Sequence, residues 1–384
     1  MQTTEEPRLE CPLCGQGHRA TSLRRGERAL CVRCGSTIAE EGWFGAETGF
    51  VFALTGLVLL VPALLLPFVT LRKAGNERIA LLGSSFEGLL ANDFGLLGAW
   101  VIFCGLIAPL ILLCLVFALR ATARSNRWWA WNAPLRQWAE RVQYWALPEV
   151  QVLGVMVAFF KLGDVVAVSV GPGLWCYGAA SICTLLAWRR FNLQPAPSAD
   201  GASESTEPPT RPGPSSLFRP VALAASAVIL LVPAYLLPVM HLGTVGQTTS
   251  DTTIFSGMVQ LWRQGLGGLA VIVFTASFLV PLLKLTGLAC LLAAVRWRRL
   301  QHARLLTRIY GAIDLIGRWS MMDVFLVAFL TGAVRFGRLA SAQPRLGIIA
   351  FAAVVVLTMS ATWSFDPRLL WVRSAPAGGE VAKS

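Results

Sequence analysis

Charged side chains are scarce in this sequence: Asp, Glu, Lys and Arg make up 14% of 384 residues, and hydrophobic residues make up 55%. Average soluble domains carry about 25% charged residues, so the composition disfavours a soluble enzyme and predicts a membrane protein. Only three His are present, which leaves little room for a His-rich active site. The chain also lacks HExxH, GxSxG and Walker A sequences. We therefore expect no enzymatic activity, and neither an intramembrane protease nor an ATP-driven pump is supported.

A disulfide framework is not indicated by the nine cysteines. Four form two CxxC pairs near the N-terminus. The others lie inside apolar runs, where Cys behaves as a small hydrophobic residue: Cys104, Cys114, Cys176, Cys183 and Cys290. No cleavable signal peptide is visible, because the first 49 residues are polar and include Glu5 and Arg24. We expect the N-terminus to be cytoplasmic and reducing.

Apolar runs long enough to cross a bilayer, about 20 residues, dominate the rest of the chain. Five are clear: 50–71, 95–119, 220–242, 267–295 and 346–364. Three others are shorter, carry charges or are separated by a tight turn: 148–168, 171–188 and 320–334. We predict an all-α polytopic membrane protein with eight transmembrane helices.

The basic residues are distributed unevenly around these spans. The formal net charge is +12. With a cytoplasmic N-terminus, 24 of the 33 Lys and Arg fall on the cytoplasmic side, seven on the opposite side and two inside spans. This is the positive-inside pattern of membrane proteins, which leaves nucleic-acid binding as a minor alternative. Both termini are predicted to be cytoplasmic.

The sequence repeats itself at an offset of 169 to 174 residues. The segment 60–67 (LVPALLLP) returns as 231–238 (LVPAYLLP), and 145–150 (WALPEV) corresponds to 319–324 (WSMMDV). We interpret this as a parallel duplication of a four-span module. The first helix of each copy is predicted to bend at paired prolines: Pro62 and Pro67, and Pro233 and Pro238.

Five segments follow from these features. Between the copies, residues 192–217 are dominated by Pro, Ser, Thr and Glu, which predicts a disordered cytoplasmic linker. The predicted boundaries are an N-terminal zinc ribbon at 1–45, a first four-span module at 46–190, the linker at 191–219, a second module at 220–372 and a disordered tail at 373–384.

Two CxxC pairs separated by 16 residues predict a structural zinc ribbon. Each pair presents two thiolates from one tight turn, followed by Gly15 in the first and Gly35 in the second. The predicted ligands are Cys11, Cys14, Cys31 and Cys34. His18 is a competing ligand and a redox dithiol is a competing function, but four thiolates favour a closed zinc site without catalysis.

Ionisable residues inside spans form a second candidate site, because a charge in hydrocarbon is costly and usually faces a polar interior. Lys161 and Asp164 lie three apart on one predicted helix face and can pair. As alternatives, Lys161 can snorkel to the surface and Asp164 can lie outside the membrane. Lys284 has apolar sequence on both sides, which favours a functional or pairing role.

Asp323 follows Ser320 by three residues and has Glu149 as its counterpart in the first copy. The alternative interpretation of both acids is a helix start, where the helix dipole favours a negative charge. The first copy has no counterpart of Lys284, because residues 109–113 are wholly apolar. Any charged transport site is therefore expected to be asymmetric and centred on the second module.

The combination of a CxxC ribbon, a Pro-containing first span, WSMMDVF at 319–325 and SFDPRLLW at 364–371 resembles the paraquat-inducible protein A family, which includes the lipophilic envelope-spanning tunnel A proteins. The resemblance covers about 10–375. It implies two tetraspanin-like modules with small extracellular strands, supplied by 72–94 and 243–266. It also places the family's central polar cluster on Lys161, Asp164, Lys284, Ser320 and Asp323. One difference is that 191–219 has no Cys, so the family's second ribbon is missing.

The resemblance further implies a bacterial inner-membrane protein that works with a periplasmic tunnel partner of the MCE (mammalian cell entry) type and moves lipids between the two membranes. We hypothesise proton coupling, in which Asp323 and Asp164 change protonation while Lys284 and Lys161 respond. Two other functions stay open. The chain can be a non-transporting scaffold that anchors the MCE partner, or a small-molecule exporter.

Overall fold

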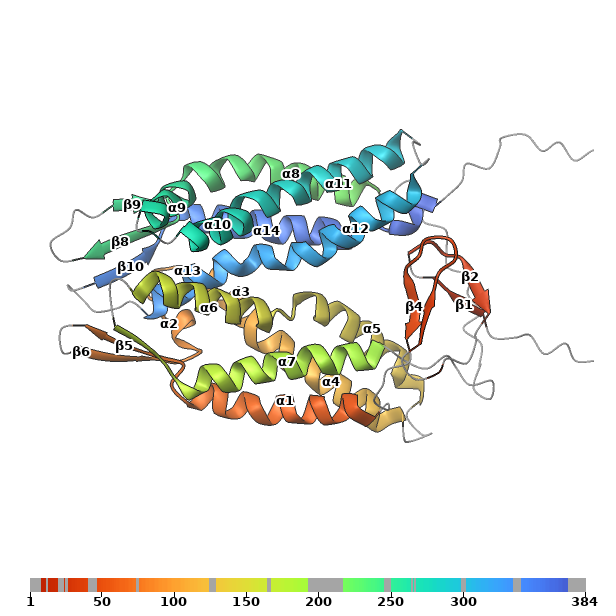
Figure 1. The fold of residues 1–384 in the computed structure, drawn as a ribbon, viewed down its shortest axis with the longest axis horizontal. Coiled ribbons are helices and arrows are strands. Elements are labelled where there is room, and N and C mark those ends of the chain that lie inside the picture. The colour runs from red at the N-terminus through yellow and green to blue at the C-terminus, as the bar shows by residue number, and fades with distance from the viewer. Residues whose placement is uncertain are drawn as a thin grey trace, which may run out of the picture.

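The computed structural model describes residues 8–11, 13–19, 24, 27–40, 47–73, 76–123, 129–163, 167–192, 217–244, 250–263, 265, 267–297, 302–333 and 340–371. The predicted linker and tail lie almost entirely outside this part of the chain. Helices dominate the fold, and the small strands gather at its two ends (Figure 1).

Six described helical segments are long and apolar enough to cross a membrane: Thr48–Leu65, Gly95–Leu119, Pro134–Phe159, Phe218–Leu236, Ala270–Arg296 and Leu346–Ser364. Length and composition therefore support a mostly helical, multi-pass membrane protein. The two other predicted spans fall on α7 (Pro172–Asn192) and α13 (Met322–Ala333). Both are helical, but α13 has only 12 residues, fewer than a bilayer requires on its own.

The same succession of elements occurs twice along the chain. The first set is α1 (Glu47–Leu65), β5 (Val69–Lys73), β6 (Asn76–Ala80), α2 (Ser84–Leu90), α3 (Gly95–Ile102), the π-helix η1 (Phe103–Ile107), α4 (Ala108–Ala123), α5 (Trp129–Trp145), α6 (Pro148–Gly163), β7 (Ala167–Val170) and α7. The second is α8 (Phe218–Leu236), β8 (Met240–Thr244), β9 (Ser250–Thr252), α9 (Ile254–Arg263), α10 (Gly267–Phe274), the π-helix η4 (Thr275–Leu279), α11 (Val280–Arg296), α12 (Ala303–Gly317), the 3-10 turn η5 (Arg318–Met321), α13, β10 (Ala340–Pro344) and α14 (Leu346–Ser364).

Each set contains a three-stranded antiparallel sheet, and both sheets lie at the same end of the molecule (Figure 1). The strand orders are β6-β5-β7 and β10-β8-β9. The family resemblance implied small strands from 72–94 and 243–266. β6 and β9 lie within these ranges, whereas β5 and β8 begin before them and the third strands, β7 and β10, were not predicted. The helix predicted through residue 168 is wrong at its end: α6 ends at Gly163 and β7 begins at Ala167, where alternating Val168 and Val170 favour a strand.

The paired prolines mark the end of the first helix in each set. Pro62 and Pro233 lie inside α1 and α8 as predicted, whereas Pro67 and Pro238 lie just beyond the helix ends. The carbonyl oxygens of Pro67 and Pro238 accept hydrogen bonds from the Gly173 and Gly347 N–H groups, at 3.0 and 3.1 Å. A Cβ on either glycine would lie within 3 Å of these carbonyl oxygens, so only glycine fits this approach of the last helix to the first. These contacts secure the pairs α1–α7 and α8–α14.

Helix α13 joins the two sets. It belongs to the second set, yet it packs on α2 and α6 of the first, and residues 322–332 are all buried (Figure 1). A Cβ added to Gly88 of α2 would lie 2.5 Å from the Gly332 Cα, so the two backbones are almost in contact. Small residues allow such close approach of helices in membranes. The hydrophobic core therefore runs continuously through both sets.

We expect Gly88→Ala to lower the apparent melting temperature in detergent, because the new methyl group forces α2 away from α13. The cost should be about 1–3 kcal/mol, as for other overpacked sites. Gly257, the counterpart of Gly88 in α9, has nothing within 4 Å of the position of a Cβ. Gly257→Ala is the matched control and should leave the melting temperature unchanged or slightly raised. Equal destabilisation by both variants would contradict this packing.

Candidate functional site

Two β-hairpins carry the four predicted metal ligands. The first consists of β1 (Arg8–Glu10) and β2 (Gly17–Arg19), the second of β3 (Arg28–Leu30) and β4 (Thr37–Glu40). Each CxxC pair forms the turn of its hairpin, and Gly15 and Gly35 complete these turns with φ of 67° and 78°. Such left-handed backbone favours glycine, which explains its place after each pair. The predicted ribbon turns are thus formed.

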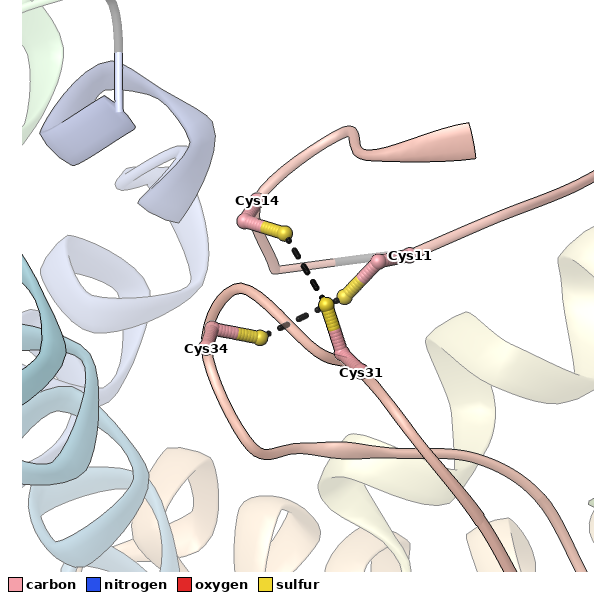
Figure 2. Close-up of side chains that lie close together, drawn as sticks. All are labelled: Cys11, Cys14, Cys31 and Cys34. Atoms are coloured by element: carbon pink, nitrogen blue, oxygen red, sulfur yellow. Dashed lines mark hydrogen bonds between the residues drawn. The ribbon is translucent and has the colours of Figure 1, made fainter. Parts of the chain in front are cut away.

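The four cysteine sulfurs converge between the hairpins (Figure 2). All four residues are buried, and their sulfurs lie within 4.8 Å of one another. Cys11 and Cys34 sulfurs are 3.5 Å apart, and those of Cys14 and Cys31 are 3.4 Å apart. A tetrahedral zinc site with Zn–S bonds of about 2.3 Å requires sulfur separations of about 3.8 Å, so the cluster fits a tetrahedral ion after a small expansion.

The surroundings of the sulfurs also suit a metal. The Ser36 hydroxyl lies 3.2 Å from the Cys11 sulfur and 3.0 Å from that of Cys34. Burial opposes ionisation of Cys11, but hydrogen bonds from Ser36 and from backbone N–H groups lower its pKa to about 7. Burial raises the pKa of Cys14 and Cys34. His18 Nε2 lies 3.3 Å from the Cys31 sulfur, so it neighbours the cluster without belonging to it.

The ribbon docks on the second set of elements, although it precedes the first in sequence. The Arg33 guanidinium lies 4.8 Å from the centre of the Trp371 ring and donates a hydrogen bond to the Trp371 carbonyl oxygen at 3.3 Å. Arg304 of α12 donates from Nε to the Arg33 carbonyl oxygen at 2.9 Å. The second CxxC turn therefore rests on α12 and on the C-terminal 3-10 turn η6 (Pro367–Trp371).

The SFDPRLLW motif builds this docking surface. The Asp366 carboxylate accepts a hydrogen bond from the Arg368 N–H at 2.9 Å, which caps η6, and Phe365 and Leu370 are buried beneath it. The Trp371 indole N–H donates to the Thr307 hydroxyl of α12 at 3.0 Å. Trp371 thus lies between α12 and the cysteine cluster, against which it packs.

A buried polar cluster lies inside the second set of helices. Lys284 of α11, Ser320 of η5 and Asp323 of α13 are 3%, 1% and 8% exposed. Ser277 of η4 is 1% exposed. The elements touch, because η4 contacts both η5 and α13, and α11 contacts η5. Lys284 Nζ and the Ser277 and Ser320 hydroxyls have no hydrogen-bond partner among the described residues. Three of the five predicted transport residues are therefore brought into one buried region.

The carboxylate that acts electrostatically on Lys284 belongs to Asp314 of α12, which the sequence analysis did not single out. One helical turn further on, a Cβ at Gly317 would lie 2.8 Å from Lys284 Nζ, so the ammonium group rests directly on the α12 backbone. Helix α12 therefore contacts the ribbon through Arg304 and approaches Lys284 through its last turn.

The π-helices η1 and η4 occupy matching places in the two sets. Both free a backbone carbonyl that a tyrosine hydroxyl then satisfies. Tyr177 of α7 donates to the Gly105 carbonyl oxygen and lies 2.7 Å from Gln151 Oε1. Tyr235 of α8 donates to the Ser277 carbonyl oxygen at 3.3 Å. Asp323 also acts electrostatically on Tyr235, so η4 borders the polar cluster.

The two sets differ where the polar cluster lies. Leu112, Gly105 and Ala146 of the first set stand in the places of Lys284, Ser277 and Ser320. Glu149, the counterpart of Asp323, acts electrostatically on Tyr177. Two of the predicted transport residues belong to the first set. Lys161 lies in α6 with its side chain outside the described part, and Asp164 lies outside the described residues. The contacts predicted for these two residues therefore stay predictions.

Comparison of the two copies would have revealed two residues that the sequence analysis missed. Tyr235 replaces Leu64 within otherwise matching segments, and Ser277 replaces Gly105. Asp314 is an acid within a largely apolar stretch, IYGAIDLIG at 309–317, but its relation to Lys284 depends on two helices distant in sequence.

These features define a mostly helical, multi-pass membrane protein in which a similar order of elements occurs twice, with a buried charged cluster in its second half and a four-cysteine ribbon at the opposite end from the two three-stranded sheets. Residues 47–196 and 217–375 match the profile of the paraquat-inducible protein A family. The chain belongs to this family, as its sequence motifs indicated.

Named relatives extend over nearly the whole chain. The intermembrane transport protein PqiA of Escherichia coli (strain K12) is 29% identical over 94% of this chain and 95% of its own length. The lipophilic envelope-spanning tunnel protein A of the same organism is 26% identical over 94% and 90%. A probable intermembrane transport protein of Haemophilus influenzae is 23% identical over 94% and 95%. No solved structure matches the chain.

Proposed function

We propose that this chain is the inner-membrane component of a lipid transport system that moves lipids between the inner membrane and a periplasmic tunnel. The names of its relatives, intermembrane transport protein and envelope-spanning tunnel protein, support this role. The observation that carries it is the buried cluster of Lys284, Ser320 and Asp323 within the helices. Charged and polar groups in hydrocarbon are expensive, and they mark transport pathways in membrane proteins. The chain itself would have no catalytic activity.

The same proposal includes the topology. Eight spans in two parallel four-helix modules would result if α7 crosses the membrane and α13 crosses it together with η5. The repeated order of elements and the two matched segments support this duplication. The ribbon end would face the cytoplasm and both three-stranded sheets the periplasm, as the distribution of basic residues predicts. The partner would be an MCE-type tunnel protein that receives or delivers lipids at the sheet end.

Proton coupling is the proposed energy source. Asp323 and Lys284 are buried on elements that both contact η5, and Asp314 supplies a second carboxylate near the Lys284 ammonium. Protonation of either acid changes the charge balance around Lys284. Since an unbalanced charge is costly in a buried site, such a change favours rearrangement of α11, α12 and α13. In the first module, Lys161 and Asp164 stay candidates for the same role.

The four cysteines would hold a structural Zn²⁺, which a closed set of four thiolates favours over a catalytic ion. We expect the purified protein to contain one zinc per chain and Cys34→Ser to lose most of it, measured by elemental analysis alongside total protein. Cys104→Ser, which changes a buried Cys far from the ribbon, is the control. Zinc far below one per chain in the unmodified protein would refute the assignment.

Transfer of lipid to the partner tests the function. The chain would be reconstituted in vesicles with a photo-activatable phospholipid and incubated with the soluble domain of the cognate MCE protein. We expect cross-linked lipid to accumulate on the MCE protein only when the vesicles contain the chain. Stable partner binding without chain-dependent lipid transfer would instead identify a scaffold, and uptake of a small molecule without any partner would identify an exporter.

A further inference from the structure

An apolar pocket lies at the sheet end of the second set, beside the polar cluster. It is small and partly open to the surroundings. Its walls come from α8, α9, α10 and η4, and are formed mainly by Tyr235, Phe255, Met258, Val273, Phe274 and Phe278. Figure 1 shows α9 and α10 near the strands and far from the ribbon. The pocket therefore lies at the end where a tunnel partner would bind.

In the first set, α2 packs on α3 and is also covered by α13 of the second set, with Gly88 almost touching Gly332. In the second set the counterpart helix α9 packs on α10, and the matching Gly257 has open space beside it. The position of Gly88 on α2 is thus covered by α13, whereas the matching position of α9 is open, and α9 lies in the half of the protein that holds the charged cluster.

The chemistry of the pocket fits a hydrocarbon chain. Its walls consist of aromatic rings and aliphatic side chains. The ring centres of Phe274 and Phe278 lie 5.4 Å apart in a stacked arrangement, and those of Tyr235 and Phe278 lie 5.1 Å apart in a tilted one. Ligand sites are typically concave and apolar with a few fixed polar groups. Here the Tyr235 hydroxyl is held on the Ser277 carbonyl oxygen. The flexible side chain of Met258 can adapt to chains of different shape.

The opening of the pocket faces outward. Phe255 lines it and is 65% exposed, and Trp262, seven residues later on the same face of α9, is 63% exposed. Large apolar side chains exposed side by side are typical of a surface that faces hydrocarbon or another apolar surface. The space is too small for a helix, which is about 10 Å wide, but its open side leaves room for part of a single chain.

We propose that this pocket, between α8, α9, α10 and η4, binds one acyl chain of a membrane lipid during its transfer and that Phe255 forms its entrance. The inference rests on the proposed lipid transport. It adds the position of the substrate: the chain would enter from the outer leaflet beside α9 and end next to Tyr235, where movement of the polar cluster can reach it.

A photo-activatable fatty-acyl phospholipid tests this site in the full-length protein in vesicles. We expect cross-links to map to 254–258 and 273–278. Val273→Trp fills the pocket and should lower cross-linking there by about five- to tenfold, as overpacking excludes the ligand. Ile272→Trp is the control. Ile272 directly precedes Val273 on the same helix, but it is 53% exposed and does not line the pocket. It should leave cross-linking unchanged.

Met258→Phe provides a second filled variant if Val273→Trp does not fold, as judged by its elution and melting temperature. Equal labelling of these variants and Ile272→Trp, or labelling spread evenly over all lipid-facing helices, would overturn the pocket. These cross-linking outcomes do not depend on whether the chain transfers lipid to a partner. If wild-type chains transfer no lipid yet label only this pocket, the transport proposal fails and the binding site stands. If transfer is normal in Val273→Trp, the pocket is not on the path.

Discussion

Lys284→Met is expected to reduce lipid transfer by about tenfold or more while the protein stays folded, because an intramembrane charge is usually functional rather than stabilising. Met keeps the length of the side chain and removes its charge at a site that is only 3% exposed. Replacing a buried charge with an apolar side chain of similar volume is often neutral or stabilising. Loss of transfer with an unchanged melting temperature would therefore separate function from folding.

The control for this variant comes from the repeat. Leu112 occupies the place of Lys284 in the first set and is also buried. Leu112→Met should retain both transfer and stability. Asp323→Asn and Asp314→Asn should each impair transfer, and Asp314→Asn tests the carboxylate that acts on Lys284. Wild-type transfer in Lys284→Met together with Asp323→Asn would end the idea of a charge relay.

Removal of the metal is expected to release the ribbon from the membrane part. The second CxxC turn presents its backbone to Arg304 and its Arg33 side chain to Trp371, so loss of the turn removes both contacts. Metal binding stabilises small ribbons strongly, and their hairpins do not persist without it. Chelation or Cys31→Ser should accelerate hydrogen exchange in 28–37 and also in the first turns of α12. The exchange rate should rise about tenfold for each 1.4 kcal/mol by which the local opening free energy falls.

Arg304→Ala separates docking from metal binding. It removes the hydrogen bond to the Arg33 carbonyl oxygen but leaves the cysteines intact. We expect normal zinc content with faster exchange in α12. Arg308→Ala, one turn later on the same helix and exposed, is the matched control. Unchanged exchange in α12 after both chelation and Arg304→Ala would contradict the docked ribbon.

This docking bears on the second ribbon that the family resemblance implies, for which 191–219 offers no Cys. The described ribbon, placed before the first set, rests on α12 and η6 of the second. Its contact at Arg304 and the Lys284 site at Asp314 and Gly317 lie at opposite ends of one helix, about 15 to 20 Å apart at the rise of an α-helix. Helix α12 therefore contacts both the ribbon and the Lys284 site.

Local patterns predicted most of this architecture. The spacing of the cysteines identified the ribbon, since each CxxC turn is completed within a few residues and requires a glycine such as Gly15. The cost of charge in hydrocarbon selected Lys284 and Asp323 without any knowledge of their neighbours. Apolar length located the long helices, and β6 and β9 lie in the segments where the resemblance implied strands.

The remaining features depend on contacts between distant segments. Strand β7 exists because it pairs with β5, almost 100 residues earlier, and its short apolar sequence reads equally well as the end of a helix. The role of Asp314 depends on where α12 passes Lys284. The contrast between Gly88 and Gly257 likewise has no local signal, because both lie in similar sequence and only the packing of α13 distinguishes them.

The most direct test of the account is the flux of a labelled phospholipid from vesicles containing this chain to the MCE partner under an imposed pH gradient. We predict transfer that requires both the chain and the partner and that responds to collapse of the gradient by an ionophore. Transfer should fall to the level of empty vesicles in Lys284→Met but not in Leu112→Met. Transfer from wild-type vesicles no faster than from empty ones, with the partner bound, would contradict it.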